Sequence, residues 1–384
     1  MDKRTVLVLG GGTGGLVAAS VLRRELAPED RVVLVERSPK HTFWPSVLWL
    51  MSGSRRAEQV QRDLLPVARR GIEVRHGDIT EIDPERRRIV VDGDMLAGDA
   101  LVVALGATLV PERVPGLAEA GGNFYTVEGA MRIHDQISNL QRGRVAVLVA
   151  DVPFKCPAAP YEAAMLLESL LRRHHVRDET TVTVYAAEPA PMAVAGPAVS
   201  QGVVEVIGRR GIDYRPSTKV TRVDAAAKRL YFDSGQEADF DVLAVVPPHA
   251  APEAVRNSPL AGPNGWIAID PATCETRFAN VFAIGDVTTV PLKLGKPLPK
   301  AGVFAGGQAE VVAHTPAARL RGRGREQRFD GHGECFIEMG GGVAGFARGN
   351  FYAEPVPQVQ MFRAGRHWHA AKVAYERNWW RSWF

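Results

Sequence analysis

The stretch Thr5-Val6-Leu7-Val8-Leu9-Gly10-Gly11-Gly12-Thr13-Gly14-Gly15 decides the fold. Its first five residues predict a short buried strand, and the residues from Leu16 to Leu26 predict a helix. The glycines between them fit the pattern G-x-G-x-x-G, which permits a tight turn, close approach of a pyrophosphate and packing of the helix on the strand. The positive end of the helix dipole also favours a phosphate there. The predicted dinucleotide contacts of this loop are Gly10, Gly12, Thr13, Gly14 and Gly15.

A second apolar segment, Arg31 to Val35, ends at an acidic residue about 20 positions beyond the glycines. This residue, Glu36, can accept a hydrogen bond from a ribose hydroxyl, and Arg37 follows it in the predicted cofactor site. The glycine pattern and the carboxylate together predict a Rossmann-like fold. Nicotinamide and flavin nucleotides both use this fingerprint, so the choice between them depends on the rest of the chain.

Two later segments favour the flavin. Leu101 to Ala107 predicts a buried strand that ends in a small-residue turn with Ala104 and Gly106. Asn280 to Asp286 predicts another strand, which ends at Gly285 and Asp286. With the first motif, these segments resemble the flavoproteins with two dinucleotide-binding domains, in which the three motifs complete one FAD site.

That resemblance implies the fold class and the division of the chain. The expected fold is α/β, with two Rossmann-like dinucleotide-binding folds, the second inserted in the first, and a C-terminal α+β segment associated with membrane and quinone. We expect the following segments: 1–110, the first part of the FAD-binding domain; 111–240, the inserted fold; 241–315, the second part of the FAD-binding domain; and 316–384, the C-terminal segment.

The inserted fold has a cysteine where a nucleotide-binding loop would have glycines. Residues 144–149 predict a strand, and the loop at 150–160 contains Cys156 and no glycine, so an NADH site is not expected there. The helix that follows and the neighbouring Lys155 both predict a stabilised thiolate at Cys156, although many lone cysteines are only small buried core residues. Glu162, in the first turn of that helix, could cap the helix or shuttle a proton.

Five stretches of the chain resemble sulfide:quinone oxidoreductases and the related flavocytochrome c sulfide dehydrogenases. They are KCPAAPYE at 155–162, VPPH at 246–249, PKAG at 299–302, GECFIEMG at 333–340 and RHWHAAKVAYE at 366–376. The resemblance covers the whole chain. The flavocytochromes attach FAD through a cysteine near the segment 41–44, and none is present there, so we expect non-covalent FAD.

The resemblance implies an FAD-dependent sulfide:quinone oxidoreductase. In such an enzyme, Cys156 and Cys335 would form a redox pair. Cys335 would lie nearer the flavin, and Cys156 would carry the sulfane sulfur, which is released as polysulfide. It also implies a donor at Lys300 near the flavin, and Tyr375 and Lys372 at the quinone. The alternatives are a type II NADH:quinone oxidoreductase, which would need an NADH site in the inserted fold, and a non-catalytic, redox-sensing flavoprotein.

Composition limits the remaining function classes. The net charge of +4 is too small to indicate nucleic-acid binding, and three cysteines without a C-x-x-C pair indicate neither a metal site nor a disulfide scaffold. The longest apolar stretch, at 100–110, is about half of the ~20 residues that a membrane-spanning helix needs. Because a predicted strand begins at Thr5, we expect no signal peptide.

The C-terminal tail has the composition of a membrane interface. Four of the seven tryptophans lie between residues 366 and 384, together with Arg and Lys. We therefore expect a peripheral protein of the cytoplasmic membrane, whose partners are hydrogen sulfide, a membrane quinone and the membrane surface, and which can form a homo-oligomer.

Overall fold

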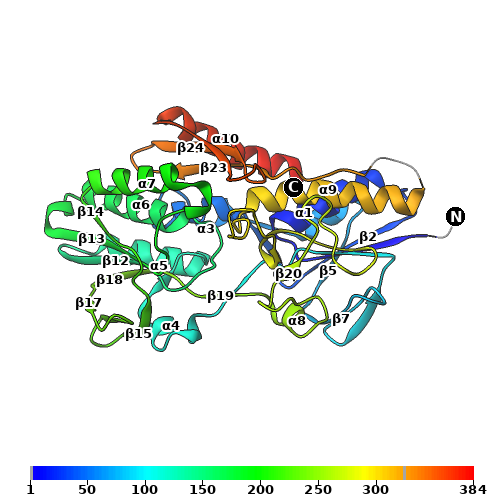
Figure 1. The fold of residues 1–384 in the computed structure, drawn as a ribbon, viewed down its shortest axis with the longest axis horizontal. Coiled ribbons are helices and arrows are strands. Elements are labelled where there is room, and N and C mark those ends of the chain that lie inside the picture. The colour runs from blue at the N-terminus through cyan, green and yellow to red at the C-terminus, as the bar shows by residue number, and fades with distance from the viewer. Residues whose placement is uncertain (1–2, 323–325) are drawn as a thin grey trace.

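A computed structural model describes residues 3–322 and 326–384, which form two lobes and a C-terminal layer that lies across both (Figure 1). Each lobe is built on a parallel sheet of five strands. This is the α/β architecture with two Rossmann-like cores that the sequence predicts.

The first lobe contains the glycine-rich loop. Its sheet has the order β21-β9-β1-β2-β5, and every neighbouring pair is parallel. Apolar residues fill the strands because helices cover them: α1 (Thr13–Glu25) packs on α9 (Gly302–Arg321). The strands are β1 (Thr5–Leu9), β2 (Arg31–Glu36), β5 (Glu73–His76), β9 (Ala100–Val103) and β21 (Val281–Ala283).

The second lobe is inserted between β9 and β21. Its sheet has the order β11-β18-β12-β13-β14, again parallel, with β11 (Gly122–Asn123), β12 (Gly143–Val149), β13 (Thr180–Ala186), β14 (Ile212–Arg215) and β18 (Val242–Val246). Its main helices are α5 (Val127–Ser138), α6 (Ala159–Arg173) and α7 (Pro197–Arg209). The expected boundary at 240 precedes β18, and the one at 315 lies inside α9; the division into domains stays a prediction.

The two chain crossings between the lobes run side by side. Strand β10 (Thr108–Leu109) leaves the first lobe, and β19 (His249–Ala250) returns to it. They pair antiparallel, with Thr108 opposite Ala250 and Leu109 opposite His249. The ends of the inserted lobe therefore meet in one short ribbon.

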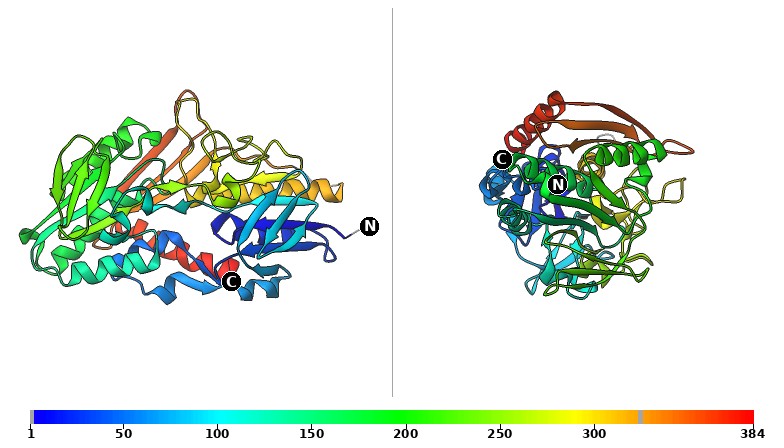
Figure 2. Two further views of the ribbon diagram at one scale, coloured as in Figure 1. Left: turned by 90° about the horizontal axis from the view of Figure 1, so that it is seen from below. Right: turned by 90° about the vertical axis from the view of Figure 1, so that its left-hand side faces the viewer.

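The C-terminal layer consists of an antiparallel sheet and one long helix. Strands β23 (His332–Glu338), β24 (Ala344–Asn350) and β25 (Gln358–Gly365) precede α10 (Arg366–Trp383). Figure 2 shows this layer, coloured orange to red, along one side of the molecule. Tryptophan side chains of α10 pack inward: Trp379 is buried against His41 and Phe43 of the first lobe.

Short elements complete the two lobes. The helices are α2 (Leu48–Met51), α3 (Ala57–Val60), α4 (Leu117–Ala120) and α8 (Glu253–Arg256). The strands are β3 (Lys40–Thr42), β4 (Gln61–Asp63), β6 (Ile79–Asp83), β7 (Arg88–Val91), β8 (Asp94–Ala97), β15 (Val220–Asp224), β16 (Arg229–Phe232), β17 (Glu237–Asp239), β20 (Ile267–Ala268) and β22 (Thr288–Thr289). Within 3–322 and 326–384, no helix has the length and apolar character needed to cross a bilayer.

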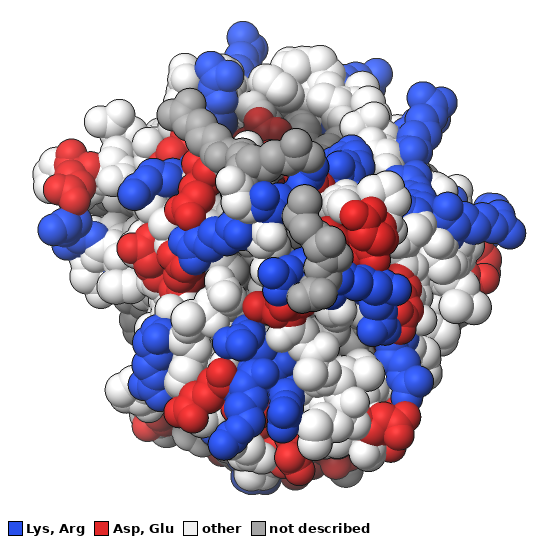
Figure 3. All heavy atoms as spheres, turned by 90° about the vertical axis from the view of Figure 1, so that its right-hand side faces the viewer, with Lys and Arg blue, Asp and Glu red and all other residues white. Residues whose placement is uncertain are grey.

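Charges of both signs are mixed on the surface. Figure 3 shows basic and acidic side chains side by side on the end of the molecule opposite the inserted lobe. Ion pairs of the molecule include Arg31 with Glu73 at 2.7 Å and Arg319 with Glu326 at 2.8 Å. Basic and acidic side chains therefore offset each other locally on this end of the molecule.

Candidate functional site

A cavity of about 880 Å³ connects the glycine-rich loop to both candidate redox cysteines. The first lobe, the inserted lobe and the C-terminal layer all contribute to its walls. Of the predicted residues, these line it: Gly10, Gly12, Thr13, Gly14, Glu36, Arg37, Ala104, Gly106, Gly285, Asp286, Lys300, Cys156, Glu162, Cys335, Lys372 and Tyr375. Gly15 lies behind the loop instead.

Glycine is needed for a different physical reason at each position of the loop. Gly10 has a φ of +100°, and a Cβ atom there would lie 2.5 Å from the carbonyl oxygen of Ala104. A Cβ atom on Gly15 would overlap the carbonyl oxygen of Gly10, so this glycine lets α1 pack on β1. Gly12 has no atom within 4 Å of its Cβ position, which leaves open space at the start of α1. That space and the helix N-terminus fit a pyrophosphate.

Two carboxylates of the first lobe face the cavity. Glu36 accepts hydrogen bonds from the backbone N–H groups of Gly11 at 2.5 Å and Ser38 at 2.9 Å, which hold it at the end of β2. The Oδ1 atom of Asp286 is buried and has no hydrogen-bond partner. Burial raises the pKa of Asp286. A buried acceptor without a donor fits a ligand hydroxyl, and together with the glycine loop these residues fit FAD.

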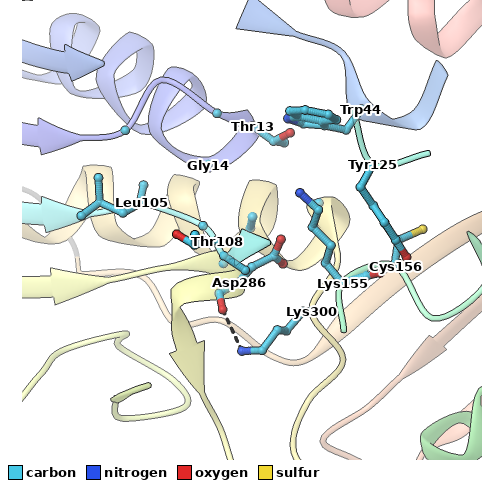
Figure 4. Close-up of a pocket in the computed structure, with 18 of the residues that line it drawn as sticks. Thr13, Gly14, Trp44, Leu105, Thr108, Tyr125, Lys155, Cys156, Asp286 and Lys300 are labelled. Atoms are coloured by element: carbon cyan, nitrogen blue, oxygen red, sulfur yellow. Dashed lines mark hydrogen bonds between the residues drawn. The ribbon is translucent and has the colours of Figure 1, made fainter. Parts of the chain in front are cut away.

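The ammonium of Lys300 is fully engaged with the protein. Its Nζ atom donates to the carbonyl oxygen of Asp286 at 2.7 Å (Figure 4). It also donates to the carbonyl oxygen of Thr288 at 2.9 Å and lies 3.5 Å from the ring centre of Trp266. Burial lowers its pKa to about 8. Through its backbone, Lys300 also holds the cysteine loop, because its carbonyl accepts a 2.6 Å hydrogen bond from the N–H of Cys156.

Lys155 brings a second buried ammonium to the cavity, and the sequence did not predict a role for it there. Its Nζ atom lies 4.7 Å from the ring centre of Trp44 and 5.5 Å from that of Tyr125, at the wall of the cavity (Figure 4). Burial lowers its pKa. Only its position next to Cys156 could have drawn attention to it from the sequence, because its aromatic neighbours come from other segments.

The two cysteines come from distant segments of the chain to one cavity. Cys156 lies in the loop before α6 with a φ of +52°, and Cys335 lies in β23. Both are free thiols and partly buried. They are near enough that Cys335 contributes to the raised pKa of Cys156.

The expectation of a stabilised thiolate at Cys156 is wrong for this state of the protein. Burial raises its pKa well above the ordinary value, and the Glu162 carboxylate raises it further. Burial likewise raises the pKa of Cys335 to about 12. The cation that favours both thiolates is Lys372, which comes from α10. The cost of burying a thiolate outweighs the favourable charges near it, and this cost is not visible in the sequence around Cys156.

Glu162 bonds across to the C-terminal layer and does not cap its own helix. Its Oε1 atom accepts from the backbone N–H of Glu338 at 2.8 Å and lies 3.3 Å from the Nζ atom of Lys372. Burial raises the pKa of Glu162. Burial opposes the charge on Lys372, but Glu162 and Glu338 outweigh it and raise the pKa of this lysine.

Tyr375 and Lys372 lie on the side of α10 that faces the cavity. The Tyr375 ring is 5.6 Å from that of Phe43 and 6.4 Å from that of Phe336, and the residue is 40% exposed. Lys372 is buried, with its Nζ atom 4.9 Å from the ring centre of Trp49. An aromatic wall thus stands at the accessible end of the cavity, with a buried cation deeper inside.

Comparisons with known proteins identify the family of this chain. Residues 4–319 match the family described as pyridine nucleotide-disulphide oxidoreductase. The chain is 27% identical to the mitochondrial sulfide:quinone oxidoreductase of Dictyostelium discoideum over 86% of this chain and 74% of the relative. It is 26% identical to the sulfide-quinone reductase of Aquifex aeolicus over 97% of this chain and 89% of the relative.

A solved structure of one of these relatives has the same fold. The X-ray structure of the Aquifex aeolicus sulfide:quinone oxidoreductase superposes with a TM-score of 0.88 and 24% identity, covering 99% of this chain and 91% of that one. The family match spans both lobes, and its members are FAD-binding oxidoreductases. The chain is accordingly a flavin-dependent oxidoreductase, and it belongs to the pyridine nucleotide-disulphide oxidoreductase family.

Proposed function

We propose that this protein is an FAD-dependent sulfide:quinone oxidoreductase. The observation that carries the proposal is the meeting of Cys156 and Cys335, 179 residues apart in the chain, in the cavity that begins at the glycine-rich loop. The relatives from Dictyostelium and Aquifex carry this activity in their names.

In the proposed reaction, the oxidised enzyme has a disulfide between Cys156 and Cys335. Hydrosulfide attacks this bond, the S–S bond breaks, and the incoming sulfur forms a persulfide on Cys156 while Cys335 leaves as a thiolate. The sulfide sulfur is thereby oxidised by two electrons. Lys372 stabilises the thiolate, because its charge lowers the pKa of Cys335 against the effect of burial. Attack of another hydrosulfide on the persulfide releases the sulfane sulfur as polysulfide.

The cofactor would be held without a covalent bond by the loop from Gly10 to Gly15, by Glu36 and Arg37, by the turn at Ala104 and Gly106, and by Gly285 and Asp286. When bound, FAD supplies the two-electron chemistry that links the cysteines to the quinone. The unpaired Oδ1 atom of Asp286 would accept a hydrogen bond from a hydroxyl group of the cofactor.

The quinone would enter beside α10. Tyr375 offers an aromatic ring at the accessible end of the cavity, and Lys372 offers a donor for a quinone carbonyl. The outer face of α10 presents exposed basic residues to a membrane surface: Arg366, Arg377 and Arg381. A homo-oligomer stays a prediction.

The test is anaerobic reduction of the purified yellow protein by sulfide and, separately, by NADH. We expect sulfide to bleach the visible absorbance of the flavin within the mixing time and NADH to leave it unchanged. The Cys156→Ser and Cys335→Ser variants should keep FAD and lose turnover with quinone. Cys274→Ala is the matched control, because Cys274 is buried away from the cavity.

Three results would contradict the proposal. Full turnover in both serine variants would exclude the cysteine pair. Bleaching by NADH alone would favour a type II NADH:quinone oxidoreductase. Reduced protein that no quinone reoxidises would favour a non-catalytic, redox-sensing flavoprotein.

A further inference from the structure

Four ionisable side chains form a continuous row from the cysteine cavity to the surface. Glu162 and Lys372 line the cavity, whereas Glu338 and His369 do not. Glu338 is 1% exposed, and the side chain of His369 is 31% exposed. The row therefore crosses the C-terminal layer from the buried thiols to water.

Each step of the row is short. The Nζ atom of Lys372 lies 3.3 Å from Oε1 of Glu162 and 4.0 Å from Oε1 of Glu338. The Nδ1 atom of His369 lies 3.1 Å and 3.0 Å from the two carboxylate oxygens of Glu338. The 4.0 Å separation between Lys372 and Glu338 is an ion-pair distance, longer than a hydrogen bond. A shift of the ammonium by about 1 Å toward Glu338 would close this step and let a proton pass along the row.

The surroundings favour a proton held inside the row. Two buried carboxylates face one buried ammonium, and the thiols of Cys156 and Cys335 adjoin them. Burial raises the pKa of Glu162, which favours its protonated form. The ring of Trp49, from α2, packs against both Lys372 and His369.

Two guanidinium groups near the row have partners outside it. Arg55 lies over Trp49, with 4.4 Å between its guanidinium carbon and the ring centre, and it binds Glu376 at 2.7 Å. Arg173, from α6, donates to the carbonyl oxygen of Ser52 at 2.8 Å. Among the described residues, neither guanidinium forms a hydrogen bond with Glu338 or His369.

The proposed reaction needs a proton from water. Oxidation of hydrosulfide to sulfane sulfur releases two electrons and one proton, and reduction of a quinone to a quinol takes up two electrons and two protons. The sum is hydrosulfide + quinone + one proton → sulfane sulfur + quinol. One net proton per turnover must reach a cavity whose two cysteines and Lys372 are at most partly exposed.

We propose that His369 and Glu338 conduct this proton from water to the Lys372–Glu162 pair. His369 takes a proton from water and donates through Nδ1 to Glu338. Lys372, having given a proton to the reacting molecule in the cavity, regains one from Glu338. The inference rests on the proposed function, since that function creates the demand for a proton.

The experiment compares His369→Ala with Glu338→Gln in the FAD-loaded protein, and uses His367→Ala as a control on the exposed side of the same helix. Two quantities are measured: turnover with quinone as a function of pH, and single-turnover bleaching of the flavin by sulfide without quinone. Imidazole is then added as an external proton carrier. Bleaching is the internal reference, because hydrosulfide brings its own proton to that step.

In mildly alkaline buffer we expect both variants to lose about tenfold or more of the quinone turnover, with bleaching unchanged. Imidazole should restore His369→Ala, whose site opens to water, and should not restore Glu338→Gln, whose site is closed. His367→Ala should match the parent protein. A structural role of His369 would not produce rescue by imidazole.

The possible failures are distinguishable. If sulfide bleaches the parent protein and His369→Ala keeps the parental pH profile, this inference is wrong and the proposed function stands. If His369→Ala loses turnover at every pH and imidazole does not restore it, the proton-conducting role is also wrong. If sulfide does not bleach the parent protein, the proposed function fails and this inference fails with it.

Discussion

At the scale of single residues, His41 joins two parts of the molecule that are far apart in sequence. Its Nδ1 atom lies 2.8 Å from the carbonyl oxygen of Gly11, and its Nε2 atom accepts from the indole N–H of Trp379 at 3.1 Å. This pattern requires a neutral imidazole with its proton on Nδ1. Burial lowers its pKa to about 4, from an ordinary value of 6.5.

The buried neutral His41 predicts a loss of stability in acid. The unfolded chain binds a proton at His41 below pH 6.5 and the folded protein only near pH 4, so stability is full above 6.5 and falls between these values. From pH 7 to pH 5 we expect the free energy of unfolding to drop by about 2 kcal/mol on this account. Urea unfolding of the parent and of His41→Gln at both pH values measures the difference.

The comparison isolates His41, because other acid-sensitive groups are common to both proteins. Among these is His249, whose pKa burial lowers to about 3. The parent should lose more stability than His41→Gln on acidification. Equal losses in the two proteins would contradict the prediction.

At the scale of elements, an ion pair with little exposure helps to hold α10 against the segment that follows α2. Arg55, which follows α2, donates from Nε and Nη2 to the carboxylate of Glu376, and the side chains are 18% and 6% exposed. Because truncation of one partner leaves the other charge nearly buried, we expect Glu376→Gln to cost about 3 kcal/mol of unfolding free energy.

A double-mutant cycle tests this element contact. With Arg55→Leu, Glu376→Gln and the double variant, urea unfolding should give a coupling energy of about 2 kcal/mol. The exposed pair Arg209–Glu205 on α7, with side chains 74% and 49% exposed, is the matched control and should couple by less than about 1 kcal/mol. Equal coupling in both pairs would show that burial does not strengthen the α10 contact.

The sequence predicts those elements whose signals are local. The strand–glycine–helix motif at 5–26 and the predicted strand at 280–286 are contiguous patterns. The structure has β1 and α1 in the first and β21 in the second, but β21 ends at Ala283, and Asp286 lies in a short 3-10 helix. The residue contacts of the site are not local. The ammonium of Lys300 lies over the ring of Trp266, and that of Lys155 lies over the ring of Trp44. Neither aromatic partner is near its lysine in the sequence.

The C-terminal tryptophans illustrate the same limit. Composition alone indicates a membrane interface, but a count of residues does not reveal which face of a helix they occupy. In the structure Trp379 is buried against His41, and Trp368 stacks on Phe346 with 4.2 Å between ring centres. Partner residues from two separate segments, at His41 and Phe346, decide this packing, and no pattern within α10 contains them.

At the scale of the whole molecule, the outer face of α10 predicts binding to anionic membranes. Each basic residue near an anionic surface contributes about 1 kcal/mol. We therefore expect the double variant Arg377→Glu/Arg381→Glu to bind anionic vesicles about 30-fold more weakly or worse, and salt to weaken the parent. Flotation with phosphatidylglycerol vesicles measures the bound fraction.

Arg86→Glu is the control for this measurement. Arg86 lies in the turn between β6 and β7, on the side of the molecule away from α10 (Figure 1). Its reversal changes the net charge without changing the α10 face, so flotation should match the parent. Parental binding by the α10 double variant would show that this helix does not face the membrane.

The short ribbon of β10 and β19 affects how the inserted lobe could be exchanged during evolution. Because the two ends of the inserted lobe are paired neighbours, the lobe is a cassette that can be cut out and replaced without separating the strands of the first sheet. Replacement would exchange the loop that bears Cys156 while the glycine-rich loop stays in place. A lineage can therefore acquire a new electron donor by swapping one contiguous piece of sequence and keep its flavin site unchanged.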